Sequence, residues 1–581
     1  MTSSRWPLAV RAATSTAIPV LVGTAVGNVG AGLIATLGAF TARFGGDRPY
    51  LNRGVQLAVV SVALAASVAM GAWSAQVAWL GVAVVSMVAV AAVWLCNALA
   101  VGPPGAYVFA LACAAGVGVS AAKLAPWQLG ALVLGGGAVA WLVQMAGVVR
   151  ERRRPERIAV AAAGAAVAAY VDAVGSAGET AARHRAAAAL HAGWNALVGF
   201  QPAAGVDDRL RQLHAANHAL HVLFTDAMTA AAVADGPAPE TAETARRIGD
   251  LTADPATVST RADDDRVPLP RPRAAVLLRR ALRPGSHVRH VMVRVAIAAP
   301  LAGAAAMLLD VGHAYWAIAA AVLVLHQGAD HSRTLRRGAD RLVGTWVGLI
   351  LAAGILWLHP QGWWLAVILA ALQLTIEMLV VRHYGLASVF ITAAALTIST
   401  GSHRVDVGEL LVARGSDTLI GCAVGVAVFL ALSRFQETGR LVDAMADVVE
   451  GIAATVPHLA CDTTTLAARR SRRDLQLAAI ELRDAVDAAA AGSARLRATG
   501  ERLRPAAVAA ERLAYRAIAA CWEMDVRAVD PRLGSDDAAA LAQQLRALAA
   551  ALRTGSTPPT VTDAPDFVAA DVAALAAALR S

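Results

Sequence analysis

The chain has 581 residues, of which 57% are hydrophobic and only 16% are charged, and its mean hydropathy is +0.54. Soluble domains carry about 25% charged residues, so this composition predicts an integral membrane protein. Basic residues exceed acidic ones by 51 to 42, yet Lys123 is the only lysine, which excludes both a phosphate-binding Gly-Lys-Ser/Thr loop and a lysine-dependent pyridoxal enzyme.

The five cysteines are dispersed and form no Cys-x-x-Cys pair. Neither a disulfide framework nor a thiolate metal site is therefore predicted. The sequence also lacks His-Glu-x-x-His and Gly-x-Ser-x-Gly motifs. We expect no cofactor, no resident metal, no catalytic residue and no nucleic-acid partner.

Apolar stretches fall in two clusters, and each cluster contains six predicted spans. Most spans approach the roughly 20 residues needed to cross the hydrocarbon, but the second span of each cluster is too short. Short spans at matching places are typical of internally repeated transporters. The predicted spans are 8–26, 28–42, 54–72, 77–96, 99–119 and 127–149, then 290–309, 315–329, 342–358, 363–381, 384–400 and 410–432.

The two clusters also match in their loops. An offset of 284 residues places Leu51-Asn52-Arg53-Gly54 on Leu335-Arg336-Arg337-Gly338. An even number of spans in each half gives both halves the same orientation. The predicted fold is an all-α membrane protein with two parallel six-helix transmembrane repeats, each followed by a cytoplasmic helical domain.

Four segments follow from this pattern: transmembrane blocks at 1–149 and 290–432, and cytoplasmic helical domains at 150–289 and 433–581. The first cytoplasmic domain includes a Pro- and Asp-rich linker, 235–273, whose Asp263-Asp264-Asp265 run we interpret as solvated. Pro505 is expected to end or kink a helix in the second. That domain also has a heptad seam, formed by Leu475, Ala479, Leu482, Val486, Ala489, Ser493 and Leu496.

The distribution of arginine predicts the orientation of the chain in the membrane. If the N-terminus lies inside, the inner loops carry nearly all the basic residues, while the outer segments carry only Lys123 and Arg404. The positive-inside rule therefore predicts a multi-pass protein of a bacterial inner membrane, with both termini and both soluble regions in the cytoplasm.

Residues 313–348 carry the most distinctive pattern. A Tyr315-Trp316 pair opens the short second span, arginines line the following loop, and Gly344-Thr345-x-x-Gly348 enters the third span. Together with Arg414-Gly-Ser-Asp417 in the last span, this resembles the fusaric acid resistance family, also called aromatic acid exporters. The resemblance implies proton-driven efflux of aromatic carboxylic acids or similar organic anions.

The residues themselves favour anion transport, because arginine's planar donor fork fits a carboxylate. Candidate anion-binding residues are Arg337, Arg341, Arg414 and Trp316. Purely structural roles stay open for two of them. Arg341 could be a positive-inside anchor, and Arg414, about 6 to 10 Å inside the outer boundary, could extend to water or neutralise Asp417 on the same helix face.

Candidate proton-coupling residues are Glu377, Asp417, Asp340 and His326. Glu377 is the clearest, because a carboxylate within a span is costly and usually faces a cavity or a partner. Arg341 and Arg382 are its expected partners. The predicted partners of the protein are a small organic anion, protons and the lipid bilayer, and a homo-oligomer is left open.

Two rival functions stay in view. The layout also resembles the plant aluminium-activated malate transporters, which favours a passive organic-anion channel, and a membrane scaffold or an enzyme of envelope biogenesis is the other alternative. In the first soluble region His214, His218 and His221 share one helix face, and we interpret them as an ordinary polar face rather than a zinc site.

Overall fold

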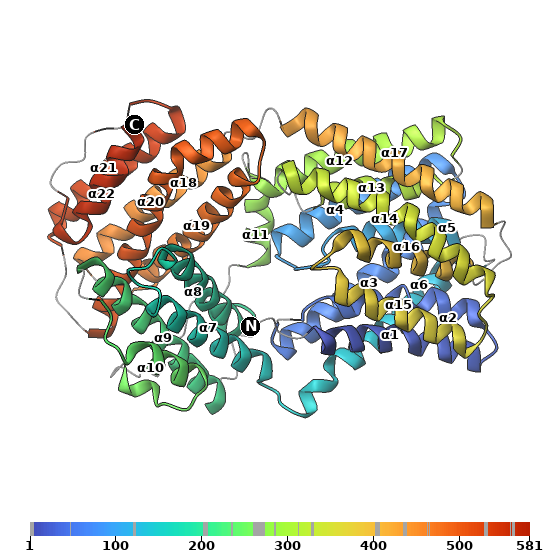
Figure 1. Ribbon diagram of the computed structural model, residues 1–581, viewed down its shortest axis with the longest axis horizontal. Helices are drawn as coiled ribbons and strands as arrows, with labels where there is room; N and C mark the ends of the chain where they lie inside the picture. The colour runs from blue at the N-terminus through green and yellow to red at the C-terminus, as the bar shows by residue number, and fades with distance from the viewer. Residues whose placement is uncertain are drawn as a thin grey trace. The chain divides into compact units, whose positions relative to one another are not determined.

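The computed structural model is all-helical over the residues that it describes, and these form two compact units (Figure 1). The membrane unit comprises 1–46, 50–152 and 272–434, and the second unit comprises 47–49, 153–271 and 435–581. The described residues are 5–580 without 47, 120–123, 202–206, 234–235, 259–272, 284–285, 312, 327–330, 401–406, 434–438, 462, 464, 528–532, 558 and 560–563. Lys123, Arg404 and the Asp263-Asp264-Asp265 run lie outside them.

The helices of the membrane unit follow the predicted spans. In the first half they are α1 (Trp6–Ala25), α2 (Val29–Ala35), η1 (Gly38–Arg43), α3 (Tyr50–Ser74), α4 (Ala78–Ala98), α5 (Tyr107–Val119), α6 (Pro126–Met145) and η3 (Ala146–Val149). In the second they are α11 (Ala274–Ala281), α12 (His287–Leu308), α13 (Ala314–Leu325), α14 (His331–Trp357), α15 (Trp363–Leu379), α16 (Tyr384–Thr400) and α17 (Val407–Ser433).

Seven of the described helices are long and apolar enough to cross a bilayer, which makes this a multi-pass membrane protein. The short second spans are confirmed, since α2 and α13 have 7 and 12 residues. The predicted fifth span began too early. Its first residues include Gly102-Pro103-Pro104-Gly105, and two prolines without amide hydrogens keep the backbone out of a helix until Tyr107.

Helix packing within the two halves is alike. The third long segment packs on the fifth and sixth in each half: α3 on α5 and α6, and α14 on α16 and α17. The contacts between the halves also correspond, because the first span of each half packs on the fourth span of the other. These contacts are α1 on α15 and α12 on α4 (Figure 1). The packing pattern of the first half thus recurs in the second.

Glycines bring the short second helix of each half against the last helix of that half. A Cβ at Gly136 of α6 would lie 1.8 Å from the Ala35 carbonyl oxygen, and one at Gly421 of α17 would lie 2.2 Å from that of Ala317. A Cβ at Gly344 or Gly348 of α14 would lie 2.6 Å from a backbone carbonyl oxygen of α16. Only glycine permits these backbone approaches.

Exposed tryptophans mark one end of the spans. Trp73 and Trp79 flank the turn between α3 and α4, and Trp357 and Trp363 flank the turn between α14 and α15. Corresponding tryptophans of the two pairs are separated by the same 284 residues that align Leu51–Gly54 with Leu335–Gly338, segments predicted as loops that lie in α3 and α14. Exposed tryptophans at helix ends are typical of the membrane–water interface.

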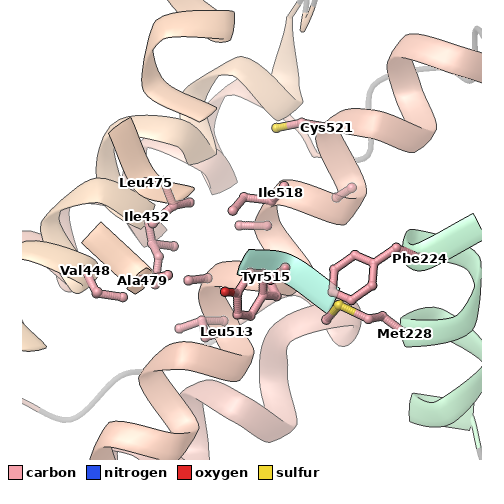
Figure 2. Packing of buried hydrophobic residues seen from close by; sticks show 14 of the residues in the cluster. Phe224, Met228, Val448, Ile452, Leu475, Ala479, Leu513, Tyr515, Ile518 and Cys521 are labelled. Atoms are coloured by element: carbon pink, nitrogen blue, oxygen red, sulfur yellow. The ribbon is translucent and has the colours of Figure 1, made fainter. Parts of the chain in front are cut away.

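The second unit is a bundle with its own core (Figures 1 and 2). Its α19 carries the heptad seam inward, with Leu475, Ala479, Leu482 and Ala489 buried against α18 and α20. The helices are α7 (Arg154–Val171), α8 (Glu179–Trp194), the π-helix η4 (Asn195–Gly199), α9 (Asp208–Val233), α10 (Thr241–Gly249), η5 (Pro255–Thr257), α18 (Gly439–Thr455), η6 (Val456–Ala460), α19 (Leu466–Ala490), α20 (Ala494–Arg527), α21 (Ser535–Thr554) and α22 (Asp566–Arg580).

Two expectations for this unit were wrong. Residues 241–249 of the predicted linker form α10, because Ala242, Ala245 and Ile248 give it an apolar face that packs on α7 and α9. Of the two outcomes expected for Pro505, a helix end is wrong, since α20 runs from 494 to 527, and a kink stays a prediction. Pro505 and Glu501 are exposed, so the carbonyl that loses its helical partner can be hydrated.

Candidate functional site

The candidate site begins with Arg414, Trp316 and Asp417. The guanidinium carbon of Arg414 on α17 lies 3.5 Å from the centroid of the Trp316 ring on α13. Arg414 is only 4% exposed, so it does not extend to water from an interface. A guanidinium over an indole face is attracted by the ring's quadrupole, and the ring holds the side chain in position.

Asp417 lies one turn further along α17 and is fully buried. Neither of its carboxylate oxygens has a hydrogen-bond partner among the described residues, and the Arg414 Nε is unpartnered in the same sense. The two residues attract each other electrostatically without forming a hydrogen bond, so the mutual neutralisation considered from the sequence is incomplete. Buried polar atoms are nearly always bonded, and exceptions call for a physical reason.

Arg341 on α14 supplies a second buried cation, 3% exposed. Its Nη1 donates to the Ser388 hydroxyl of α16 at 3.3 Å, while its Nε is unpartnered within the described chain. Arg341 and Arg414 are close enough for their charges to repel each other. Burial separates Arg341 from the aqueous interface, where an anchor arginine would lie.

Further polar atoms around these arginines are also unsatisfied. Thr345 Oγ1 on α14 and the Tyr384 hydroxyl on α16 are buried and have no hydrogen-bond partner in the described part of the structure. The Tyr384 side chain interacts electrostatically with Arg341. The unsatisfied donors and acceptors come from α14, α16 and α17, and α13 contributes the ring under Arg414. We call these residues the arginine site, defined by Trp316, Arg341, Thr345, Tyr384, Arg414 and Asp417.

Three of the other predicted residues lie outside the arginine site. Arg337 is half-buried one turn before Arg341, and half-buried Asp340 lies 3.9 Å from the exposed Arg336. His326 is buried at the contact of α13 with α5, where its Nδ1 pairs with the Leu323 carbonyl and its ring lies 5.9 Å from that of Tyr107.

Glu377 is buried on α15, but its predicted partners were wrong. Its Oε1 lies 2.9 Å from Arg43 Nε of η1 and accepts a hydrogen bond from Gln373 Nε2 at 3.1 Å. Arg43 also donates to Gln373 Oε1 at 3.2 Å. Because α15 packs on α1 and α16, Glu377 faces the first half, while Arg341 points to Ser388 and Arg382 is exposed.

The described residues of the first half form no equivalent of the arginine site. At the offset of 284 residues, Arg341, Arg414 and Asp417 correspond to Leu57, Gly130 and Val133. Leu57 and Val133 are fully buried and apolar. The two halves therefore share their helix packing but differ in their buried charges.

Sequence reasoning missed several residues. Arg43 looked like a loop anchor, and only the fold shows its contact with α15. Arg294 of α12 is also buried, over the Phe429 ring at 4.8 Å. Arg294 lies near the start of a span, so its position in the sequence does not distinguish it from an ordinary positive-inside arginine. Ser388 and Tyr384, one turn apart on α16, could have been found from the close packing of Gly344.

The three histidines of α9 are not a solvated polar face. His221 is buried, donates from Nδ1 to the Asn217 carbonyl at 2.8 Å, and lies 5.1 Å from the Trp522 ring of α20. His218 is edge-on to the same ring, and His214 pairs with the Leu197 carbonyl. Burial lowers the pKa of His221 to about 4 and also lowers that of His214.

Comparisons with known proteins match the chain to membrane proteins. Residues 301–428 match the family described as fusaric acid resistance protein-like. Over 549 residues the chain is 26% identical to the uncharacterized membrane protein YvaC of Bacillus subtilis, with 89% of this chain and 85% of that protein covered. A 162-residue stretch is 30% identical to the uncharacterized protein slr1298 of Synechocystis, with 27% of this chain and 20% of that protein covered.

No solved structure matches the chain significantly. The family match contains every residue of the arginine site, and the membrane relative covers both halves. The resemblance predicted from Tyr315-Trp316 and Arg414-Gly-Ser-Asp417 is confirmed: the second half of this multi-pass membrane protein is fusaric acid resistance protein-like.

Proposed function

We propose that this protein is a secondary transporter that exports small organic anions, with aromatic carboxylates the best-fitting class, in exchange for protons. The observation that carries the proposal is Arg414, a buried guanidinium placed on Trp316 with an unpartnered Nε. A buried arginine within a membrane span is costly, and such residues usually mark a substrate or ion pathway.

The anion would bind to the edge of Arg414 that Trp316 leaves free. The indole holds the guanidinium face, and the guanidinium edge presents parallel N–H donors that fit a carboxylate bidentately. The Trp316 ring and the neighbouring Tyr315 ring, 5.5 Å apart, offer an aromatic surface for the rest of the ligand.

Arg341 would also stabilise the bound anion. Two buried cations that repel each other leave an excess of positive charge between α14 and α17. A carboxylate placed between them relieves that repulsion, and Thr345 and Tyr384 can donate hydrogen bonds to it. Arg337, half-buried one turn nearer the predicted cytoplasmic end, is suited to the approach path.

Asp417 is our first candidate for the proton carrier. It is fully buried, unpartnered among the described residues and three residues from Arg414. Protonation of Asp417 changes the net charge of the arginine site by one, which would couple proton movement to anion occupancy. Protonation of Glu377 would weaken its ion pair with Arg43 and so change the contact between the halves. Asp340 and His326 would relay protons at the inner end of the spans.

The movement would be a rocking of the two parallel halves. The shared helix packing and the matching tryptophan pairs support a parallel repeat, which suits alternating access. The arginine distribution supports an inner-membrane location with cytoplasmic termini.

Flux in proteoliposomes tests the proposal. Purified protein should accumulate benzoate against its gradient when a pH gradient is imposed, and Asp417→Asn should abolish accumulation while keeping benzoate exchange. A passive channel would instead dissipate both gradients and show unitary currents. Uphill accumulation that is unchanged in both Asp417→Asn and Glu377→Gln would remove proton coupling from these residues.

A further inference from the structure

The second unit contains a cavity of about 470 Å³ between α18, α20, α21 and α22. This volume falls in the range of small-molecule sites. Its lining comprises Val442, Arg495, Thr499, Arg502, Leu503, Ala551, Leu552, Gly555, Ser556 and Leu579. The neighbouring helices can be followed in Figure 1, where α18, α20, α21 and α22 lie in one bundle.

One wall of the cavity is cationic. Arg495, Thr499 and Arg502 occur at i, i+4 and i+7 on α20, so all three lie on one helix face. Neither guanidinium has a hydrogen bond or an ion pair with any other described residue. The two guanidinium groups, on helix positions about 10 Å apart, are long enough to converge on one bound group.

No acidic residue lines the cavity, and two acids of α18, Asp447 and Glu450, are engaged elsewhere. Arg553 of α21 binds both Asp447 and Glu450 of α18, at 2.7 and 2.6 Å. The end of α21 is also capped, since Gly555 and Ser556 both donate to the Ala551 carbonyl.

The opposite side of the cavity is apolar. Val442, Leu503, Leu552 and Leu579 contribute side chains from four helices, and Gly555 leaves open space where a Cβ would stand. A free phosphate ion would use the arginines but gain nothing from these surfaces. An organic anion with an apolar body would bury that body and pair its charge at once.

We propose that this cavity, which we call the α20–α21 pocket, is a second anion site that binds a small amphiphilic carboxylate outside the membrane. Arg495 and Arg502 pair with the carboxylate, and the four apolar side chains hold the hydrocarbon. The site does not depend on transport, because its residues belong to the second unit alone.

Photolabelling of the full-length purified protein with 4-benzoylbenzoate tests the proposal. Peptide mapping should find label on residues 495–503 or 551–556, and benzoate should compete whereas benzamide, its neutral analogue, should not. Arg495→Gln combined with Arg502→Gln should reduce this label at least about tenfold, equivalent to about 1.4 kcal/mol of binding free energy. Arg504→Gln, an exposed arginine on the same helix that does not line the cavity, should leave it unchanged.

Thr499→Trp provides a second variant that keeps every charge but fills the cavity, and it should remove the label as well. Label that persists in Thr499→Trp, or equal competition by inorganic phosphate, would show that surface charge alone recruits the probe and would overturn the proposal. Complete absence of label from these peptides in folded wild-type protein would do the same. Label on α13, α14 or α17 reports the arginine site and is scored separately.

Discussion

Arg43 of η1 and Glu377 of α15 form an ion pair of 2.9 Å that joins the two halves of the membrane unit. Gln373 hydrogen-bonds to both residues of the pair: its Nε2 donates to Glu377, and its Oε1 accepts from Arg43. Arg5 adds a hydrogen bond from the start of α1 to the Glu377 carbonyl at 3.0 Å. Charges from three segments of the sequence thus fix the position of α15 against the first half.

Removal of one partner should cost more than removal of both. Arg43→Met or Glu377→Met leaves a buried charge alone, which typically costs about 3 to 5 kcal/mol, whereas the double substitution leaves no orphaned charge. Thermal unfolding in detergent should therefore rank the double variant above both single variants. A double variant whose loss equals the sum of the single losses would mean that the pair has no energetic coupling.

Trp316 should control the affinity for aromatic anions through Arg414. Trp316→Leu removes the ring beneath the guanidinium, so we expect the apparent KM for benzoate to rise about tenfold, while Trp316→Phe keeps a face and should lose less. The same assay with acetate separates the two roles of the ring. Loss for benzoate but not for acetate would show ligand stacking, equal loss would show positioning of Arg414, and no loss in either would contradict a role in the site.

Gly136 and Gly135 are adjacent on α6 and differ only in their surroundings. A Cβ at Gly136 would collide with the Ala35 carbonyl, and one at Gly135 would meet open space. We expect Gly136→Ala to destabilise the protein by about 2 kcal/mol or more because α2 must move, and Gly135→Ala to be neutral or stabilising. Melting temperatures in detergent provide the comparison, and equal values would contradict the close contact.

The second unit should lose stability in mild acid because of His221. Its pKa is about 4 in the folded chain, chiefly because burial disfavours the imidazolium, with the charges of His218, Arg472 and His191 acting in the same direction and the bond to Asn217 against it. In the unfolded chain it titrates near 6.5. The unfolded state therefore binds more protons between these values, and the free energy of unfolding falls as pH drops through them, by about 2 kcal/mol at pH 5.

Hydrogen exchange of α9 peptides, corrected for the pH dependence of intrinsic rates, measures this loss between pH 7 and pH 5. His221→Gln keeps a polar side chain without the titration and should flatten the profile by that amount. An identical profile in the variant would assign the acid sensitivity to other groups, of which His214 and His191 are the first to test, since burial lowers their pKa values too.

The spans could be predicted closely because long apolar stretches have few alternatives in a membrane protein. The two short second helices and most of the heptad seam follow from local patterns, although Ser493 and Leu496 of the predicted seam lie beyond the end of α19. The sequence left open whether Arg341 and Arg414 point inward. The Gly-Pro-Pro-Gly run before Tyr107 also indicated that the fifth helix begins late. The hydropathy pattern, which averages over several residues, did not show this start.

Contacts between distant segments could not be predicted. Nothing local distinguishes Arg43, a partner of Glu377 across 334 residues of sequence, from the neighbouring loop arginines. The α20–α21 pocket combines residues from four helices, and only the packing of α18, α21 and α22 around α20 brings Arg495 and Arg502 over an apolar floor. The difference between the two halves at Leu57 and Arg341 became meaningful only when their helices were seen to pack alike.

The most direct test of the central claim is the benzoate dependence of proton-driven transport in Arg414 variants reconstituted in liposomes. Arg414→Lys keeps the charge but loses the planar donor fork, and Arg414→Gln loses both, so the apparent KM should rise in that order, with uphill transport abolished in Arg414→Gln. Arg382→Gln, which removes an exposed arginine of the same half, should match the wild type. A wild-type KM and undiminished accumulation in a correctly folded Arg414→Gln protein would contradict the assignment of the anion site to Arg414.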